Sequence, residues 1–301
     1  ADRRIPIRDE LPLHPDVTAL KQWLAYSALR VGLAVLGVLP EPAIRWLGRL
    51  GGRLWYLLDG KRRRMALRHM RRVGEPPSAA VAVFESYGRY WAESLWVRPR
   101  RLPAMWKRMT VEGIENIWAA REGGRGAVVV LPHVGNWEAA ALIGVHEQIP
   151  VVAVAERLAN RRITEWFTRQ RAMFGIEIVL TGKRLTPALL QALEQGKFVC
   201  LLSDRDLSGR GLEVEFFGET TTLPAGPVVL ARKARVPILP VAVFFQQGAG
   251  HRAVIRPPLP PPDDLAEGIQ AVARELEELI RLDPTQWHLV QPNWPSDRAS
   301  G

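Results

Sequence analysis

The amino-acid sequence predicts an α/β protein with a mostly parallel central sheet flanked by helices, preceded by an N-terminal apolar and basic helical region. Three observations support this. From about residue 110, short apolar runs alternate with longer stretches of helical periodicity. The short runs are apolar throughout, as in strands that are buried on both faces. Before them, residues 18–58 are rich in leucine, valine and tryptophan, with arginines interspersed. A chain of 301 residues suits one large domain or a domain with a helical appendage.

Five apolar runs predict the strands of the sheet. They span residues 126–132, 151–155, 176–180, 198–203 and 236–245. The stretches that connect or follow them predict helices at 137–146, 163–174, 186–195, 225–233 and 265–281. The proline-rich segment at 257–264 predicts a linker into the last helix. This alternation argues for helices on both faces of the sheet and for functional residues where the strands end.

The region before the sheet predicts two apolar helices over 18–58, divided by Pro40 and Pro42, and a further helix over 78–96. Seven of the twelve residues from Lys61 to Arg72 are Lys or Arg. An apolar helical pair beside a basic run is typical of an interfacial anchor that contacts anionic lipid headgroups. A core helix followed by a solvated charged helix is the alternative. We divide the chain into an N-terminal extension (1–17), a helical membrane-associating region (18–109) and an α/β core (110–297).

The charge balance indicates an anionic partner. Lys and Arg number 41 against 31 Asp and Glu, and the net charge of +10 favours nucleic acid, an acidic membrane surface or a phosphorylated substrate. The sequence contains no recognisable nucleic-acid-reading module, so no nucleic-acid partner is expected. Its charge-free stretches are too short to span a bilayer, so we expect peripheral membrane contact. The one cysteine, Cys200, excludes an intramolecular disulfide, and its apolar neighbours predict a buried, inert thiol.

The segment VVVLPHVGNWEAA carries the main chemical signal. His133 follows a buried strand, Gly135 and Asn136 break that strand, and Asn136 is a candidate N-cap of the next helix and a candidate substrate contact. Glu138 lies five residues after His133, which within one helix would separate the two side chains by about 140°. They converge only if His133 is still in the turn while Glu138 is in the first helical turn. A histidine in this position, followed by a carboxylate, predicts a functional residue.

Acyl transfer to an alcohol suits such a pair. An imidazole that titrates near neutrality can take the proton of a hydroxyl as it attacks a thioester. A carboxylate bonded to the other ring nitrogen fixes the tautomer and stabilises the imidazolium. The sequence has no Gly-x-Ser-x-Gly elbow. We therefore predict direct attack on the acyl donor, without a covalent enzyme intermediate.

A second polar cluster is expected at the same edge of the sheet. Asp204, Arg205 and Asp206 follow the strand at 198–203. Two acids around an arginine are suited to orienting His133 and to binding a phosphate or an oxyanion. An ordinary polar turn with internal ion pairs is the alternative. Because no second histidine or cysteine is well placed beside them, no metal site is expected.

Two further arginines are candidates for the phosphate of a substrate. Arg157 follows a predicted strand, and Arg171 lies on a predicted helix. A solvated helix face is the alternative for these residues.

The motif of His133, four residues and Glu138 resembles that of the glycerolipid acyltransferase superfamily. Several ordered blocks are more specific, and they span roughly residues 20–297: AERL, RQRAMFGIE, DRDLSGRGLEVEFFGE, LPAGPVVLA and WHLVQPNWPSD. These blocks are similar to those of the lipid A late acyltransferases and, within that branch, of the actinobacterial phosphatidylinositol mannoside acyltransferases.

This resemblance implies transfer of a palmitoyl-type chain from acyl-CoA to the 6-hydroxyl of a mannose of phosphatidylinositol mannosides, at the cytoplasmic face of the plasma membrane. The implied partners are acyl-CoA as co-substrate, a mannosylated phosphatidylinositol and an anionic membrane surface, and no cofactor is implied. The resemblance also implies that the α/β core is an acyltransferase core. The acyl chain is expected in an apolar tunnel of this core.

The resemblance also implies roles for individual residues. His133 matches the base, Asp204 the carboxylate that partners it, and Arg171 and Arg205 the arginines near the substrate. Glu138 completes the superfamily motif and is implied to be catalytic or to brace the turn. Whether Asp204 or Glu138 contacts His133 directly stays open.

Two other functions also stay open. One is acylation of a different lipid, such as lipid A or a lysophospholipid. The other is a basic membrane- or nucleic-acid-binding protein that has kept the fold without the activity. The intact set of His133, Glu138 and Asp204 argues against this second alternative.

Overall fold

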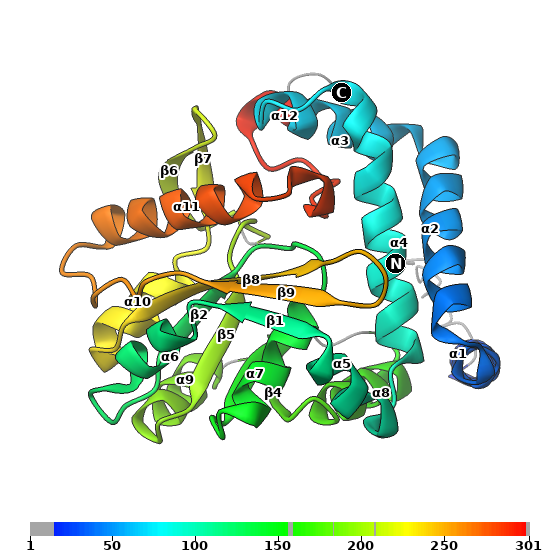
Figure 1. The fold of residues 1–301 in the computed structure, drawn as a ribbon, viewed down its shortest axis with the longest axis horizontal. Coiled ribbons are helices and arrows are strands. Elements are labelled where there is room, and N and C mark those ends of the chain that lie inside the picture. Colours follow the sequence, from blue (N-terminus) through cyan, green and yellow to red (C-terminus); the bar gives the residue numbers. More distant parts are fainter. Residues whose placement is uncertain (1–14, 156–158, 183, 208, 299–301) are drawn as a thin grey trace, which may run out of the picture.

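The structure of the protein is a computed structural model that describes residues 15–155, 159–182, 184–207 and 209–298. Its centre is a seven-stranded sheet in the order β1–β9–β8–β2–β5–β3–β4, beside a separate hairpin of β6 and β7 (Figure 1). Neighbouring strands of the sheet are parallel except β8 and β9. The mostly parallel sheet predicted from the sequence is confirmed. The strands are β1 (Met109–Glu112), β2 (Val128–Leu131), β3 (Val151–Ala155), β4 (Ile176–Leu180), β5 (Phe198–Leu202), β6 (Leu212–Phe216), β7 (Glu219–Leu223), β8 (Ile238–Phe245) and β9 (His251–Ile255).

Helices flank this sheet on both faces, as predicted. The N-terminal helices are α1 (Pro15–Val38), α2 (Glu41–Leu58), α3 (Gly60–Arg72), α4 (Ala80–Trp96) and α5 (Leu102–Lys107). The helices of the α/β part are α6 (Ile114–Arg121), α7 (Ala141–His146), α8 (Arg161–Ala172), α9 (Leu185–Glu194), α10 (Gly226–Ala234), α11 (Leu265–Arg281) and α12 (Pro295–Arg298). The predicted break between two apolar helices falls at Pro40, between α1 and α2.

Strand β2 shows why the strands of this sheet are apolar throughout. Successive side chains of a strand point to opposite faces. Val128 and Val130 accordingly pack with α9, α10 and α11, whereas Val129 and Leu131 pack with α6 and α7 on the other face. Because both faces are covered, a polar residue on either face would be buried without a partner.

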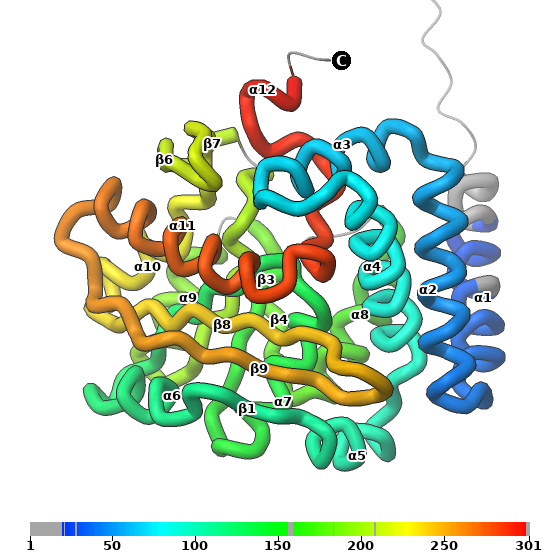
Figure 2. Tube along the Cα trace, turned by 45° about the horizontal axis from the view of Figure 1, so that its top comes forward, coloured from blue at the N-terminus to red at the C-terminus, as the bar shows by residue number. Residues whose placement is uncertain are grey.

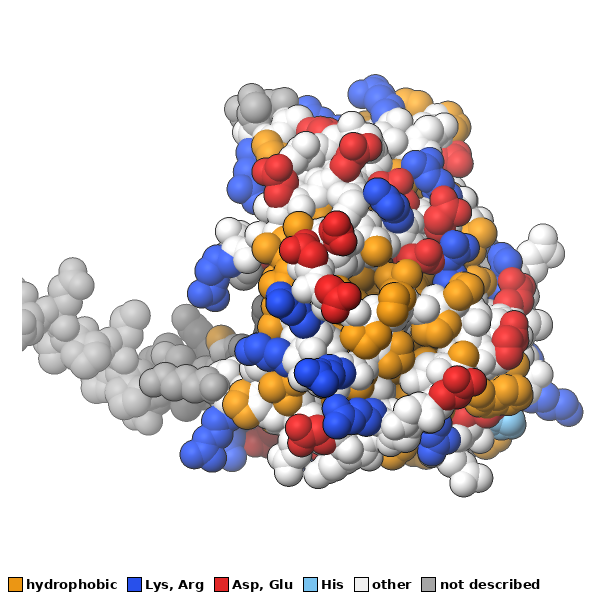
Figure 3. Space-filling model, turned by 90° about the vertical axis from the view of Figure 1, so that its left-hand side faces the viewer, with side chains coloured by type: hydrophobic (Ala, Val, Ile, Leu, Met, Phe, Trp, Pro, Cys, Tyr) orange, Lys and Arg blue, Asp and Glu red, His pale blue; other side chains and the backbone are white. Residues whose placement is uncertain are grey.

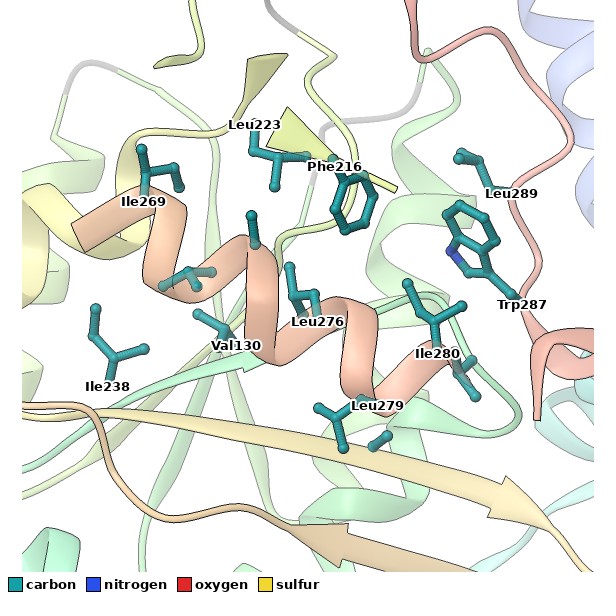
Figure 4. Packing of buried hydrophobic residues seen from close by; sticks show 14 of the residues in the cluster. Val130, Phe216, Leu223, Ile238, Ile269, Leu276, Leu279, Ile280, Trp287 and Leu289 are labelled. Atoms are coloured by element: carbon teal, nitrogen blue, oxygen red, sulfur yellow. The ribbon is translucent and has the colours of Figure 1, made fainter. Parts of the chain in front are cut away.

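Helix α11 lies across one face of the sheet through a single apolar stripe. Its bounds are those predicted from the sequence, and Asp264 caps its first turn by accepting hydrogen bonds from the amides of Ala266 and Glu267. Ile269, Leu276 and Ile280 point into the core, which also receives side chains from the sheet, the hairpin and the C-terminal segment (Figure 4).

The apolar runs of the sequence do not predict the edge strand β1, the strand β9 or the β6–β7 hairpin. In β9, His251, Ala253 and Ile255 are buried, while the residues between them are partly exposed. Strands with one partly solvated face alternate between buried and exposed side chains and lack a continuous apolar run. The helix predicted over 137–146 also begins differently, as a 3-10 turn at Trp137–Ala140 that leads into α7.

Helices α2 and α4 lie side by side and pack at very short distance (Figure 2). Gly48 and Gly52 are buried on the face of α2 that meets α4. A Cβ atom built on Gly52 would lie 2.1 Å from the carbonyl oxygen of Phe84, and one built on Gly88 would lie 2.1 Å from that of Gly48. Only glycine permits this backbone contact. The opposite face of α2 carries exposed apolar side chains, among them Trp46, Leu50 and Leu54.

The basic run predicted at Lys61–Arg72 forms α3, and the structure divides its charges into two groups. Arg72 bonds Glu219 and Asp297 and lies 3.9 Å above the ring of Trp294, so it anchors the C-terminal segment. The exposed cations Lys61, Arg64 and Arg71 face solvent. The end of the molecule farthest from α1 and α2 exposes hydrophobic side chains among both acidic and basic ones (Figure 3).

Replacing Gly52 with alanine is expected to lower the free energy of unfolding by about 1–3 kcal/mol, because the added methyl group forces α2 and α4 apart. Gly51→Ala is the matched control, since its Cβ would meet no atom within 4 Å. There, alanine should stabilise the helix by up to about 1 kcal/mol. Urea unfolding of both variants measures the difference, and equal stabilities would contradict the close packing.

Candidate active site

The site lies at the carboxyl edge of the sheet, where two neighbouring strands end together. β2 and β5 are adjacent and parallel, and Leu131 pairs with Leu202 in their register. The amide of Ser203 extends the pairing by donating to the carbonyl of Leu131. His133 and Asp204 each follow two residues later. Residues far apart in sequence therefore arrive side by side because the strand register puts them there.

His133 and Asp204 form a directly bonded pair. Nδ1 of His133 lies 2.6 Å from Oδ1 of Asp204, and the backbone amide of His133 donates to Oδ2 at 3.1 Å. Asp204 is fully buried, whereas the His133 side chain is 29% exposed. The carboxylate thus orients the ring from inside the protein, while the ring itself reaches accessible space. The open question of which carboxylate contacts His133 is answered in favour of Asp204.

The carboxyl group of Asp204 remains ionised despite its burial. Burial by itself opposes ionisation, but the charge and hydrogen bonds of His133 and the hydrogen bond from Trp287 outweigh it and lower the Asp204 pKa. A buried anion bonded to Nδ1 stabilises a positive charge on the ring, and it leaves Nε2 as the nitrogen that can exchange a proton with a substrate.

The C-terminal segment supplies partners that sequence reasoning missed. The indole N–H of Trp287 donates to Oδ2 of Asp204 at 2.7 Å, and the side-chain amide of Asn293 donates to the Asp204 carbonyl. The amide of His288 donates to the carbonyl of His133 at 2.8 Å. These residues lie more than 80 positions from Asp204 in the sequence. In the sequence, the closing block WHLVQPNWPSD contains these residues and resembles the family, but it does not indicate which residues they contact.

His288 lies close to the pair but has a different environment. Its Nε2 lies 2.8 Å from Oγ of Ser86, and its ring stacks on Tyr87 with centroids 4.7 Å apart. Burial and the nearby His133 hold its pKa well below the ordinary value for histidine. The His288 side chain is therefore neutral, and the residue supports the loop of His133 through its backbone amide.

Glu138 bonds residues other than His133. Its Oε1 accepts hydrogen bonds from Nε of Arg171 at 3.1 Å and from the hydroxyl of Tyr90 at 3.2 Å. Burial and the charge of Glu138 keep the pKa of Tyr90 well above its usual value, so the hydroxyl remains a donor. Glu138 thus joins the turn after β2 to α4 and α8, and it holds Arg171 at the site.

The structure contradicts the prediction that the side chain of Asn136 caps the next helix. It occupies the N-cap position of the 3-10 turn, but its side chain makes no capping hydrogen bond. It is 1% exposed and donates to Glu93, which also receives hydrogen bonds from Arg89 and His251. Burial opposes ionisation of Glu93, but His251 and Arg89 outweigh it and lower the Glu93 pKa to about 2. We therefore assign Asn136 to this buried support beneath the loop and not to substrate contact.

A cavity of about 360 Å³ opens beside His133 and runs between α7 and the sheet. Polar residues lie at one part of its wall, among them His133, Glu138, Arg171 and Arg205. The remainder is mainly apolar: Leu131, Trp137, Ala140, Ala141, Val151, Ala153, Val154, Ile176, Cys200, Leu201, Leu202 and Leu207. The structure thus brings two of the three predicted arginines, Arg171 and Arg205, to the cavity. Arg157 lies outside the described residues.

This arrangement suits acyl transfer. The oriented imidazole of His133 lines a cavity whose wall is mainly apolar, and cationic side chains lie beside it. Within the described residues, the hydrogen bond between Arg171 and Glu138 uses only Nε of the arginine. The terminal amino groups of Arg171 are therefore left for an anionic or hydroxyl-bearing ligand.

Comparison with known proteins agrees with this chemistry. Residues 12–296 match the family model of the bacterial lipid A biosynthesis acyltransferases. The chain is 33% identical over 301 residues to a phosphatidylinositol mannoside acyltransferase of Mycolicibacterium smegmatis, covering 95% of this chain and 94% of that protein. It is 34% identical over 302 residues to one of Mycobacterium tuberculosis H37Rv, covering 96% and 94%.

A more distant relative is a lipid A biosynthesis acyltransferase of Haemophilus influenzae, which is 22% identical over 183 residues, 60% of this chain and 57% of that protein. The family match spans almost all of the chain, including both strand ends that carry the histidine–aspartate pair. The protein therefore belongs to the bacterial lipid A biosynthesis acyltransferase family and is an acyltransferase.

Proposed function

We propose that the protein transfers a long-chain, palmitoyl-type acyl group from acyl-CoA to the 6-hydroxyl of a mannose of phosphatidylinositol mannosides. The observation that carries this proposal is the His133–Asp204 pair at the mouth of the apolar cavity. The relatives that cover nearly the whole chain are named phosphatidylinositol mannoside acyltransferases, which supports the choice of acceptor.

His133 acts as the general base in this proposal. Nδ1 is held by Asp204, so Nε2 takes the proton of the mannose hydroxyl while the oxygen attacks the thioester carbonyl. The imidazolium that forms is stabilised by the Asp204 anion. When the tetrahedral intermediate collapses, the carbon–sulfur bond breaks and His133 returns the proton to the departing thiolate. An ester and free CoA result, and no enzyme group is acylated.

Different parts of the cavity wall suit different parts of the two substrates. The apolar side chains from β3, β5 and α7 suit the acyl chain, because each methylene moved from water into such a site is worth about 0.8 kcal/mol. Arg171 and Arg205 lie at the polar wall and suit the phosphate groups of CoA or of the acceptor, since guanidinium groups bind phosphate through paired donors.

We further propose that α1 and α2 dock on the cytoplasmic face of the plasma membrane. None of the helices in the described part of the chain has both the length and the apolar character of a membrane span. α2 instead exposes large apolar side chains along one face, opposite the face packed on α4: Trp46, Leu47, Leu50, Leu54, Leu57 and Leu58. The exposed cations of α3 follow directly and suit anionic headgroups.

Replacing His133 with alanine is expected to reduce kcat/KM for acyl transfer by about 10²–10⁴-fold, because the general base is lost. The measurement is the acylated product formed from palmitoyl-CoA and purified phosphatidylinositol mannosides. His146→Ala is the matched control, since this exposed histidine bonds Glu147 and stacks on Trp106. Transfer by the His133 variant at the wild-type rate would rule out the mechanism. Product formed only when lipid A or a lysophospholipid replaces the mannosides would contradict the proposed acceptor.

Replacing Trp287 with phenylalanine should leave the ring packing but remove the donor to Asp204. The buried carboxylate then lacks one partner and holds His133 less firmly. We expect kcat to fall roughly tenfold, with little change in the KM for acyl-CoA. Trp118→Phe is the control, because the indole of Trp118 is exposed and bonds Glu147. An unchanged kcat in the Trp287 variant would show that Asp204 orients His133 without the hydrogen bond from Trp287.

Replacing Leu54 with glutamate should weaken the binding of the protein to vesicles that contain anionic lipid. A leucine side chain moved out of water is worth about 1.5–3 kcal/mol, so flotation should need roughly tenfold more lipid or beyond. Leu282→Glu is the matched control, since Leu282 is 46% exposed against 50% for Leu54 but lies after α11. Equal losses in the two variants would contradict docking through α2.

A further inference from the structure

A polar segment, residues 205–211, joins β5 to β6 and lies beside the cavity at His133. Two of its residues, Arg205 and Leu207, line that cavity. None of the described residues of this segment is buried, and Leu207 is 66% exposed. Apolar burial therefore contributes little to holding the segment in place. Its position depends instead on hydrogen bonds.

Asp206 accepts three such hydrogen bonds. Its Oδ1 accepts from the amide of Gly209 at 3.1 Å, and its Oδ2 accepts from the amide of Gly211 at 2.7 Å. Oδ2 also accepts from the hydroxyl of Thr222 in β7 at 3.1 Å. One carboxylate thus closes a turn of the segment and ties that turn to the β6–β7 hairpin.

Two glycines allow their amides to reach this carboxylate. Gly209 has a φ of +64°, in the left-handed region that favours glycine. A Cβ atom built on Gly211 would lie 2.8 Å from Oδ2 of Asp206 and 2.3 Å from the carbonyl oxygen of Leu223. A side chain at this position would push the segment away from Asp206 or from β7. The turn therefore depends on one acid and two glycines together.

Arg205 lies between two anchored carboxylates. Asp204 before it bonds His133 and Trp287, and Asp206 after it bonds the turn and β7. The backbone of Arg205 is thus fixed on both sides, and its side chain lies at the wall of the cavity.

We propose that Asp206 is a positioning residue that holds Arg205 where it binds a phosphate group of a substrate. This inference rests on the proposed function, which supplies a phosphate in CoA and another in the acceptor. Guanidinium groups bind phosphate through donors of fixed direction, so a shift of the backbone weakens the contact.

The sign of the effect distinguishes positioning from charge. A carboxylate beside a phosphate site repels the phosphate, so charge alone predicts tighter binding when Asp206 is removed. Positioning predicts weaker binding, because the segment that carries Arg205 is released from β7. The two roles of the acid therefore predict opposite results.

Replacing Asp206 with alanine is expected to lower kcat/KM for transfer from palmitoyl-CoA to phosphatidylinositol mannosides by about tenfold. The loss should appear in the KM of one substrate, with kcat nearly unchanged. Arg205→Ala should lose at least as much, and the double variant should be no worse than Arg205→Ala, because both changes act on one contact. Asp206→Asn keeps one acceptor oxygen and should lose less than the alanine variant.

Substrates without phosphate identify the group that Arg205 binds. S-palmitoyl-pantetheine replaces palmitoyl-CoA in one arm, and a soluble alkyl mannoside replaces the acceptor in the other. The loss should vanish in the arm that lacks the bound phosphate and persist in the other. Asp264→Ala is the matched control, since this carboxylate also accepts from two backbone amides but caps α11, on the opposite face of the sheet from α7.

Several outcomes would overturn the positioning role and leave the proposed function standing. They are an equal or higher kcat/KM in Asp206→Ala, equal losses in every arm, and a double variant that is worse than Arg205→Ala. If Asp206→Ala does not fold, as judged by its thermal unfolding, Thr222→Val decides in its place. This variant keeps the shape and all charges but removes one donor, so a several-fold loss confined to the phosphate-bearing arm is expected and an unchanged kcat/KM overturns the proposal.

Absence of transfer by the wild-type protein would contradict the proposed function instead. Calorimetric titration with CoA and with the deacylated, phosphate-bearing mannoside headgroup then tests Asp206 directly. Weaker binding of one of these ligands by Asp206→Ala than by the wild type supports the positioning role. Equal, tighter or undetectable binding of both overturns it.

Discussion

The geometry of the candidate active site depends on one buried anion, Asp204, that is held ionised at the end of a central strand. A carboxylate removed from water is costly unless every oxygen is bonded. Here Oδ1 binds the ring of His133, and Oδ2 accepts from the amide of His133 and the indole of Trp287. The same bonds that stabilise the anion also orient the imidazole of His133, so the stability of the loop and the orientation of the ring depend on each other.

Two sets of hydrogen-bonded polar residues lie around this pair. Beneath the turn after β2 lies a bonded set formed by Glu93, Arg89, His251 and Asn136, which ties α4 to the sheet. On the cavity side, Glu138 bonds Arg171 and Tyr90. The turn after β2 therefore carries His133 on one side and, through Glu138, holds Arg171 at the cavity wall on the other. Movement of α4 would disturb both at once.

The close packing of α2 on α4 connects this site to the surface of the molecule. Glycines on one face of α2 allow the backbones to touch, and that leaves the opposite face of α2 to present apolar side chains outward. α3 follows, and Arg72 clamps the C-terminal segment whose Trp287 and Asn293 bond Asp204. The helices proposed to meet lipid are thus covalently and structurally continuous with the segment that completes the pair. This continuity is consistent with an enzyme whose substrates reside in a membrane.

Local sequence alone determined the fold class, the strands β3 and β4 and the bounds of α11, because apolar runs and helical stripes depend on near neighbours. It also placed His133 and Asp204 at strand ends. Strand order could not be obtained in this way, since it depends on contacts between distant segments. The register of β2 with β5 decided that Asp204 reaches His133, whereas Glu138, only five residues away, bonds Arg171. Tertiary structure alone likewise brought Trp287 to the carboxylate, buried Asn136 against Glu93, and put Cys200 on the wall of the cavity beside His133. Spacing along a chain describes which residues share a face of one element, but a site made from several elements exists only once they pack.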